Sequence, residues 1–259
     1  MKILKGNYIK LPRIGIVKTY EILPSVPVKN VIISKRAGNW YISFKYDEGP
    51  TPTAKQGDII GVDVGINALA TCSDGTTYAN VKAYKQAKKR LSRYQRRVKK
   101  KELGSKNRAK AIKKLARLHK KVADIRADAL HKLTTWASFK PQHHSDRKLE
   151  CKWNAEKAVR PRDDDSSLAE RAPRDHKLAS AIADCGFYEF KRQLSYKCEC
   201  YGSQLVIAPR FYPSSQICSQ CGHQQKMPLH KRTYECSNCG FEADRDFNAA
   251  INLKNYVNQ

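Results

Sequence analysis

The chain has 259 residues, and its 50 Lys and Arg against 24 Asp and Glu give a formal net charge of +26 at pH 7. A globular protein this basic needs a polyanionic partner, and nucleic acid meets that need better than an anionic membrane surface. No apolar run reaches the length of a membrane span, and the N-terminal residues lack the apolar core of a signal peptide. We therefore expect a cytoplasmic protein with reduced thiols and no membrane partner.

The first 50 residues favour β-structure. Residues 8–10, 14–20, 28–35 and 39–46 are rich in β-branched and aromatic side chains, and a hairpin signal lies between the last two runs. This segment is too small for a sound core of its own. We expect it to be either a partial β-barrel or an extension packed on the main domain, followed by a linker rich in Pro and Thr.

A candidate metal ligand follows in residues 58–67. An apolar strand ends there at the carboxylate of Asp63 and passes into a glycine turn, and residues 68–72 and 76–78 indicate two further strands. An acid at the end of a central first strand, followed by a meander, is how RNase H-like nucleases present their first metal ligand. On this stretch alone, a simple turn residue is an equally good interpretation of Asp63.

Residues 81–120 carry 18 Lys or Arg and a single acid, Glu102. Apolar residues at helical spacing predict a two-helix hairpin over residues 81–135 that breaks near Gly104. The charge is too one-sided for an ordinary solvated helical face, so we interpret the hairpin as a platform that binds a nucleic-acid backbone with salt-sensitive affinity. The candidate contacts are Lys88, Lys89, Arg90, Arg93, Arg96, Arg97, Lys99 and Lys100.

Periodicity fails between residues 137 and 175, where Pro and Asp cluster, and we expect this segment to be disordered. Helical spacing returns between residues 176 and 200, and residues 204–208 indicate a buried strand. Five cysteines in the chain belong to no knuckle and are expected to be free: Cys72, Cys151, Cys185, Cys198 and Cys200. We expect the last two on the surface of a helix.

Two Cys-x-x-Cys knuckles, Cys218 with Cys221 and Cys236 with Cys239, lie near the C-terminus. This separation brings four thiolates around one tetrahedral Zn²⁺. The alternative is that the cysteines form disulfides or are incidental, which paired knuckles in a chain without a secretory signal disfavour. We therefore expect a zinc ribbon over residues 218–240.

Asp244 and Asp246 follow the ribbon almost at once and precede a helix-like run. A carboxylate is favourable at a helix N-terminus, so either acid could serve only as an N-cap. A metal clip this close to the pair would also determine where Asp246 points. With Asp63 available as its partner, we favour the interpretation that both acids are metal ligands.

Four stretches together resemble the TnpB family, the OrfB proteins of bacterial insertion sequences, which are often described as transposases and are similar to type V CRISPR effectors. They are Gly61-Val-Asp-Val-Gly-Ile-Asn-Ala-Leu-Ala-Thr, Phe187-Tyr-Glu-Phe, Phe211-Tyr-Pro-Ser-Ser-Gln-Ile-Cys-Ser-Gln-Cys-Gly-His and Asp244-Arg-Asp-Phe-Asn-Ala-Ala-Ile-Asn-Leu. The resemblance covers roughly residues 1–136 and 176–255.

The resemblance implies an α/β fold in which a RuvC domain of RNase H-like fold covers residues 51–217 and 241–259. The zinc ribbon is inserted near its end, and a wedge-like partial β-barrel over residues 1–50 precedes it. The resemblance also implies transposition-linked DNA chemistry: a guide RNA made from the element's own end, and metal-dependent endonuclease cleavage of DNA.

The family's catalytic site has three acids, of which the first falls on Asp63 and the third on Asp246. These acids hold two Mg²⁺ or Mn²⁺ ions roughly 4 Å apart. The second acid should be a Glu that ends a buried apolar strand soon after Trp136, and the sequence indicates no such strand. Reverse translation of residues 146–157 in a shifted frame permits Ile-Glu-Asn-Leu-Asn-Val-Ser-Gly-Met-Leu-Lys, which resembles the missing motif, so we interpret the middle of the chain as frameshifted.

The family's N-terminal half-barrel and inserted helical domain are also not recognisable, which favours a decayed, N-terminally truncated copy. Three functions follow as hypotheses. The chain is a RuvC-type DNA endonuclease by lineage that has lost its second catalytic acid, or it is a remnant that binds RNA or DNA without cutting, or it is a pseudogene product with no selected role.

Overall fold

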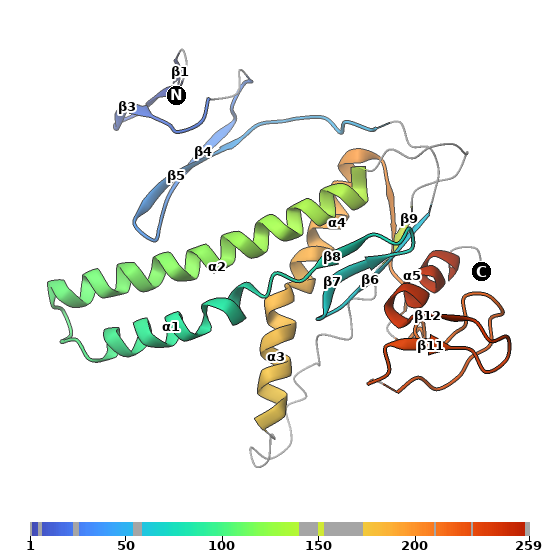
Figure 1. Cartoon of the computed structure of the whole chain (residues 1–259). Coiled ribbons are helices and arrows are strands. Elements are labelled where there is room, and N and C mark those ends of the chain that lie inside the picture. The colour runs from blue at the N-terminus through green and yellow to red at the C-terminus, as the bar shows by residue number, and fades with distance from the viewer. Residues whose placement is uncertain are drawn as a thin grey trace, which may run out of the picture. The chain divides into compact units, whose positions relative to one another are not determined.

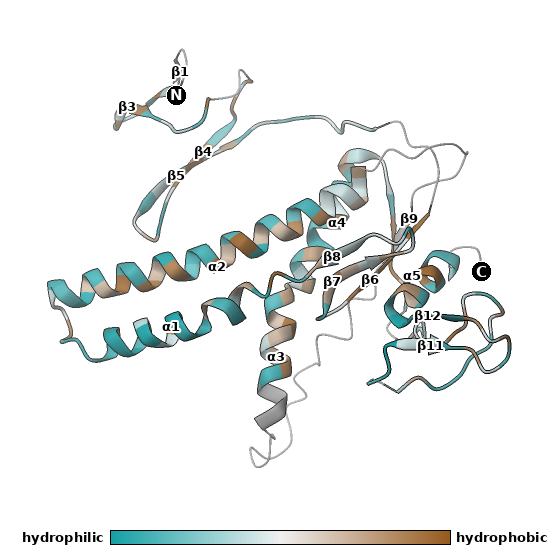
Figure 2. Cartoon of the chain, in the orientation of Figure 1, coloured by the Kyte–Doolittle hydropathy of each residue, from teal (hydrophilic) through white to brown (hydrophobic). Residues whose placement is uncertain are grey.

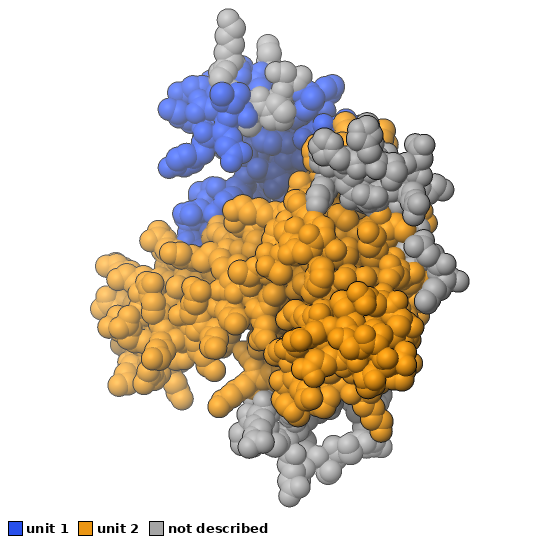
Figure 3. Space-filling model, turned by 45° about the vertical axis from the view of Figure 1, so that its right-hand side comes forward, with its two compact units in different colours: residues 1–49 blue, residues 50–259 orange. Residues whose placement is uncertain are grey.

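The computed structural model describes residues 2–4, 7–22, 26–53, 59–139, 150–152, 173–209, 211–228 and 230–256. The chain divides into two units, residues 1–49 and residues 50–259, which Figure 3 colours separately. Each unit has a cluster of buried apolar side chains, so each is held together by a core of its own.

Two small antiparallel sheets make up the unit of residues 1–49. One contains β1 (Lys2–Ile3), β2 (Tyr8–Leu11) and β3 (Gly15–Lys18), and the other is the hairpin of β4 (Asn30–Arg36) and β5 (Asn39–Lys45) (Figure 1). Ala37 and Gly38 form the hairpin turn with φ angles of 52° and 86°, which are typical of a type I′ turn. The four strands expected from the sequence are confirmed.

An apolar contact joins these two sheets. Ile9 and Leu11 of β2 are buried, and Val31, Ile42 and Phe44 of the β4–β5 hairpin pack against them. In the described part of this unit the two sheets share no hydrogen-bonded ladder. The strands are therefore present, whereas their assignment to a wedge-like barrel stays a prediction.

A five-stranded mixed sheet lies at the centre of residues 50–259. Its strands are β6 (Ile60–Val64), β7 (Ala68–Cys72), β8 (Thr77–Ala79), β9 (Glu150–Lys152) and β10 (Gln204–Val206), in the order β10-β9-β6-β7-β8 (Figure 1). β6, β7 and β8 form an antiparallel meander, whereas β9 runs parallel to both β6 and β10. The first strand of this unit is therefore the central one.

The main core lies on one face of β6. Ile60 and Val62 belong to a buried cluster with side chains of β7 and of the helices α2 (Lys106–Phe139), α3 (Pro173–Cys185) and α4 (Phe187–Tyr201). These side chains are Leu69, Ala70, Cys72, Leu130, Leu133, Ala137, Cys185, Phe190, Leu194 and Cys198. Cys198 is 2% exposed, so its expected place on the helix surface is wrong, whereas Cys200 is exposed. Cys198 is buried because its face of the helix covers the sheet.

The opposite face of β6 is covered by α5 (Arg245–Asn255). Gly61 lies so close to this helix that a Cβ atom built on it would stand 1.9 Å from the carbonyl oxygen of Ala250. Alternate residues of a strand share a face, so Asp63 lies on the same side of β6 as Gly61. The strand thus directs its core side chains toward α2 and α4, and its carboxylate toward the side that α5 covers.

The expected basic hairpin is confirmed as α1 (Ala83–Lys99) and α2 (Lys106–Phe139), joined by a loop in which Gly104 has a φ of 79° (Figure 1). α3 (Pro173–Cys185) and α4 (Phe187–Tyr201) follow, with a break at Gly186. Within the described ranges, none of the helices is long and apolar enough to cross a membrane.

The expected disorder of residues 137–175 is wrong at three places. α2 extends to Phe139, residues 150–152 form β9, and α3 begins at Pro173. The rest of that segment lies outside the described residues. α2 continues past Trp136 because Ala137 and Ser138 are buried against the core, and β9 forms because it gains a ladder on both edges. A strand therefore does follow Trp136.

Candidate functional site

The four knuckle cysteines converge on one point. Their Sγ atoms all lie within 4.8 Å of one another, with 3.7 Å between Cys218 and Cys239 and 3.6 Å between Cys221 and Cys236. Four thiolates about 2.3 Å from a tetrahedral ion lie about 3.8 Å apart, so the sulfur cage has the size that Zn²⁺ requires. The cluster could hold one zinc ion, which would act as a structural clip.

The two knuckles have the same backbone geometry. Gly222 and Gly240 donate their N–H groups to the carbonyls of Cys218 and Cys236, each at 3.0 Å, with φ angles of 74° and 72°. Glycine is suited to both positions because a left-handed conformation carries no Cβ penalty there. A backbone hydrogen bond from His223 lowers the pKa of Cys221 to about 6, which favours the thiolate that a metal ligand requires.

The ribbon is attached to α5 by two buried asparagines, Asn248 and Asn252. Asn248 donates to the carbonyl of Ile217 at 2.8 Å and accepts from the backbone N–H of Ser219 at 3.0 Å. Asn252 donates to the carbonyls of Ser214 and Ile217 at 2.8 and 2.6 Å. The signal in the sequence was their spacing of four, which places both amides on one face of the helix.

Asp244 and Asp246 have different roles. Asp244 is the N-cap of α5, where its side chain accepts from the N–H groups of Asp246 and Phe247 at 2.9 and 3.0 Å. Asp246 lies in the first turn with its side chain 25% exposed, 3.1 Å from Arg245 and 3.8 Å from Arg232. The N-cap role thus belongs to Asp244. The carboxylate of Asp246 does not cap the helix and could bind a cation, which would have to compete with the guanidinium groups of Arg245 and Arg232.

Asp63 and Asp246 are carried by elements that pack against each other. Asp63 is half-buried near the end of β6, and Asp246 belongs to the helix that lies over Gly61 on the same face. The structure therefore brings the two elements together as expected. The two acids as a shared metal site stay a prediction.

The register of β9 shows where Glu150, an acid that follows Trp136 in the sequence, lies along the sheet. Ile60 pairs with Cys151 in the parallel ladder, so the backbone of Glu150 lies four residues before the level of Asp63, about 13 Å along the strand. The backbone of Glu150 therefore does not lie at the level of Asp63 in the sheet. Among the side chains that the structure describes, the four cysteines form the only cluster of three or more candidate metal ligands.

The candidate nucleic-acid contacts are exposed. Lys88, Lys89, Arg90, Arg93, Arg96, Arg97, Lys99 and Lys100 all point to solvent, and Figure 2 shows α1 as mostly hydrophilic. α1 buries only Ala83 and Leu91 and has no acid in its first turn. The surface therefore presents positive charge that no acid of α1 compensates, which suits a phosphate backbone.

An aromatic ring lies within this basic surface. The guanidinium carbons of Arg93 and Arg97 lie 5.9 and 6.0 Å from the ring centre of Tyr94. A hydrogen bond from Arg90, followed by the charges of the neighbouring arginines, lowers the pKa of Tyr94. Arginines around an aromatic ring can contact both phosphates and bases, so this patch is chemically suited to a single strand as well as to a duplex.

Two family models match the chain. The model described as "Probable transposase" matches residues 42–136, and the model described as "Cas12f1-like, TNB domain" matches residues 187–253. The first match covers the second half of β5, the β6–β8 meander and most of the basic hairpin. The second covers α4, β10, the cysteine cluster and most of α5. Asp63 and Asp246 thus lie in different matched domains.

Similar proteins are known from bacteria. A "Putative RNA-guided DNA endonuclease" of Streptomyces pristinaespiralis is 35% identical over 88% of this chain and 52% of its own length. The protein named InsQ in Escherichia coli K12, described by the same words, is 36% identical over 87% of this chain and 56% of its own length. The chain therefore spans about half the length of the curated relatives it matches.

A solved structure shares the fold. The cryo-EM structure of a CRISPR-Cas12f ternary complex matches with a TM-score of 0.52 and 19% identity, over 87% of this chain and 44% of that one. The mixed α/β architecture described above is thus that of a known effector protein. The two family models and the curated relatives show that the chain contains an OrfB-type transposase domain and a Cas12f1-like TNB domain, and that over most of its length it is similar to proteins named as putative RNA-guided DNA endonucleases.

Proposed function

We propose that this chain is a nucleic-acid-binding protein of a transposable element. We also propose that it descends from proteins that use a guide RNA to cleave DNA at a RuvC-like site. One observation carries the proposal: Asp63 lies near the end of the central strand, on the face that α5 covers, and Asp246 lies in the first turn of that helix. The DNA target and a guide RNA from the element's own end are the partners that this lineage implies.

The sheet supports an RNase H-like assignment of this domain. Its first strand is central and ends near an acid, an antiparallel meander lies on one side, and two parallel strands lie on the other. Nucleases of this architecture hold their metal ions at the end of the central strand. The ribbon over residues 218–240 then lies between β10 and the helix that supplies the last acid.

Asp63 and Asp246 are the residues that would hold Mg²⁺ or Mn²⁺, ions that prefer carboxylate oxygens. Such ions activate water and stabilise the leaving oxygen of a phosphodiester. This chain's own residues supply two carboxylates near α5, and Arg245 and Arg232 compete for one of them. With no third acid among the described side chains to complete a cluster, we propose that the chain binds the cation weakly and cleaves DNA negligibly.

The test is nonspecific cleavage of a labelled single-stranded DNA in Mn²⁺ by the full chain, by Asp63→Ala and by a version with the shifted frame restored over residues 146–157. We expect no cleavage above background from the first two and measurable cleavage from the third. Robust cleavage by the unmodified chain that Asp63→Ala abolishes would overturn the inactive assignment and require a third ligand from outside the described residues.

A non-cleaving binding protein is the second candidate, and the exposed basic surface of α1 favours it, because phosphate binding needs no catalytic acid. Binding of duplex DNA and of single-stranded RNA by the full chain, titrated over a series of salt concentrations, tests it. A steep fall of affinity with salt supports the assignment. Binding too weak to saturate either probe at low salt would leave only the pseudogene hypothesis.

A further inference from the structure

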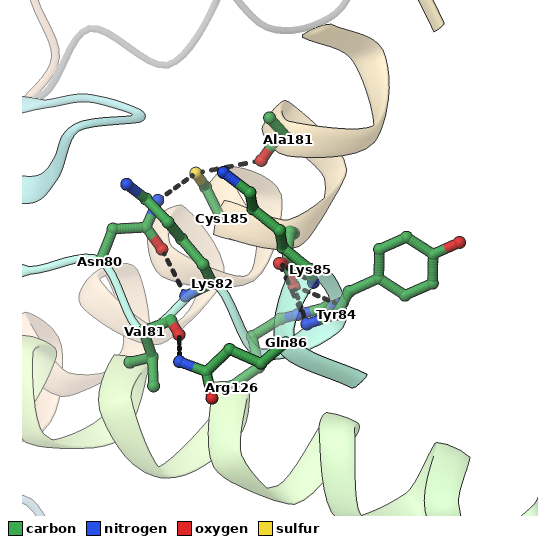
Figure 4. Close-up of polar contacts among 10 residues, drawn as sticks. Asn80, Val81, Lys82, Tyr84, Lys85, Gln86, Arg126, Ala181 and Cys185 are labelled. Atoms are coloured by element: carbon green, nitrogen blue, oxygen red, sulfur yellow. Dashed lines mark hydrogen bonds and ion pairs between the residues drawn. The ribbon is translucent and has the colours of Figure 1, made fainter. Parts of the chain in front are cut away.

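The first turn of α1 is capped by a residue from another helix. Its own N-cap residue, Lys82, has a left-handed conformation with a φ of 48° and provides no side-chain cap. The carboxylate of Asp184, near the end of α3, instead accepts from the N–H of Tyr84 at 3.0 Å and from the N–H of Lys85 at 3.3 Å. Figure 4 shows the two capped residues together at this turn. Capping from a distant element fixes where the helix begins relative to that element.

The same carboxylate also holds α2. Arg126 donates from Nη2 to Asp184 Oδ1 at 3.0 Å. The side chain of Asp184 is 5% exposed, and a buried carboxylate is tolerated only when hydrogen bonds and opposite charge satisfy it. Here the N–H groups of one helix and the guanidinium of another meet that requirement, so both arms of the basic hairpin are attached to α3 at one point.

Further hydrogen bonds link this attachment point to the loop that follows β6 and the candidate ligand Asp63. Asn80 donates from Nδ2 to the carbonyl of Ile66 at 2.7 Å, and its Oδ1 accepts from the N–H of Lys82 at 3.0 Å. Its Nδ2 also lies 3.3 Å from the Sγ of Cys185, the residue after the capping aspartate (Figure 4). One polar cluster therefore contacts the start of the hairpin, the end of α3 and the loop that follows β6.

We propose that Asp184 is a positioning residue that holds the basic hairpin in one orientation relative to the loop after Asp63, so that nucleic acid bound along α1 is presented to the end of β6. The presentation of nucleic acid rests on the proposed function. The capping role rests on the contacts of Asp184 alone. The hydrogen bonds of Asp184 described above join it to Tyr84, Lys85 and Arg126, and Asp184 is not one of the basic residues assigned to nucleic-acid binding.

The direction of the change in nucleic-acid affinity distinguishes a positioning role of Asp184 from a simple effect of its charge. Removing one negative charge from a protein with a net charge of +26 should leave its affinity for a polyanion unchanged or raise it. Loss of the helix cap should instead lower the affinity for nucleic acid, because the exposed basic residues of α1 would no longer be held in a single arrangement. Asp128 is the matched control, since it lies on the same hairpin, is exposed, and forms an ion pair with Lys132 on its own helix.

The experiment compares the full chain with Asp184→Asn, Asp184→Ala and Asp128→Asn. Hydrogen exchange first reports the cap: the amides of Tyr84 and Lys85 should exchange about tenfold faster or more in Asp184→Ala, given the strength of hydrogen bonds to a charged acceptor. Asp184→Asn should show a smaller change, because its amide oxygen still accepts. Unchanged protection of both amides in both variants would overturn the proposal. Protection of Leu133 in the core checks folding, and the Asn variant carries the test if the Ala variant fails that check.

Affinity for duplex DNA and single-stranded RNA is the second readout. Asp184→Ala should bind several-fold more weakly than the unmodified chain with the same salt slope, because no phosphate contact is removed, whereas Asp128→Asn should bind at least as tightly as the unmodified chain. Equal affinity of the Asp184 variants and Asp128→Asn would refute positioning. If the unmodified chain binds neither probe, the proposed function and the presentation of nucleic acid fail together, while the exchange data still decide whether Asp184 caps α1.

Discussion

Replacing Gly61 by alanine should force α5 away from β6. A Cβ atom at this position would stand 1.9 Å from the carbonyl oxygen of Ala250 and 2.6 Å from the backbone nitrogen of Lys254. Non-bonded heavy atoms prefer a separation of about 3.5 Å, so the helix would have to retreat by more than about 1 Å. Both clashing atoms belong to the backbone, and no side-chain rotation can relieve them.

The cost should be large for a single methyl group. Overpacking a core costs about 1–3 kcal/mol and sometimes more, and here the displaced helix carries the buried residues Ala249, Ala250 and Leu253. We expect the free energy of unfolding to fall by about 3 kcal/mol, which corresponds to a fall in Tm of roughly 6–12 °C. Thermal unfolding followed by circular dichroism measures this change.

Two other glycines provide graded controls. Gly49 has no atom within 4 Å of an added Cβ, and at Gly65 the nearest atom is the carbonyl oxygen of Ala68 at 3.2 Å. We expect Gly49→Ala to melt like the unmodified chain and Gly65→Ala to fall between the two. If Gly61→Ala melts together with Gly49→Ala, then α5 does not lie against β6 as described, and the shared face of Asp63 and Asp246 loses its support.

Three further predictions concern charge and metal. Reversing Lys88, Lys89, Arg96 and Arg97 to Glu should weaken DNA binding strongly and reduce the salt slope by about 0.9 per lost phosphate contact; an unchanged slope would place the contact surface elsewhere. Metal analysis should find one Zn²⁺ per chain, and a chelator should unfold the ribbon; zinc-free protein with four titratable thiols in the ribbon would contradict the cysteine assignment. Hydrogen bonds from Arg192 lower the pKa of Glu189 from 4.5 to about 2. Glu189 therefore contributes stability that is present above about pH 4.5 and lost as the pH falls toward 2, so the deficit of Glu189→Gln in urea unfolding should shrink over that range rather than stay constant.

The features that the sequence predicted correctly are local ones. The meander, the two arms of the hairpin and both knuckles each show their pattern within one contiguous stretch, as a residue period, a turn at Gly104 or a Cys-x-x-Cys spacing. Asp63 and Asp246 were singled out for the same reason, because each stands next to the end of a recognisable strand or the start of a recognisable helix. Local patterns were enough to find candidate residues.

The features that it did not predict depend on distant partners. β9 has three residues with no apolar alternation, and its pairs lie on β6 and β10, so no window around it shows a strand. Asp184 accepts a hydrogen bond from Tyr84, 100 residues earlier in the chain, and no sequence pattern near Asp184 indicates that partner. The sequence around Cys198 does not show which face of α4 is covered, because that depends on the sheet packed against the helix. The expectation that Cys198 is exposed is wrong for this reason. Tertiary contacts decided each of these cases.

The ribbon and the candidate catalytic helix form one mechanical unit. Asp244 is both the last residue of β12 (Glu242–Asp244) and the N-cap of α5, so no linker residue separates the strand from the helix. β12 pairs with β11 (Thr233–Glu235), and the N–H of Arg245 continues that pairing to the carbonyl of Arg232 at 2.7 Å. Asn248 ties the next turn of the helix to the first knuckle.

A metal ion among the four cysteines would therefore act on Asp246 without touching it. It would hold both knuckles, the knuckles would hold β12 and Asn248, and these would set the direction in which α5 leaves the ribbon. Gly61 then sets how closely the same helix approaches β6. The position of Asp246 relative to Asp63 thus depends on two features outside the candidate site. One is the cluster of four cysteines, and the other is the lack of a side chain at Gly61, which lets α5 approach β6.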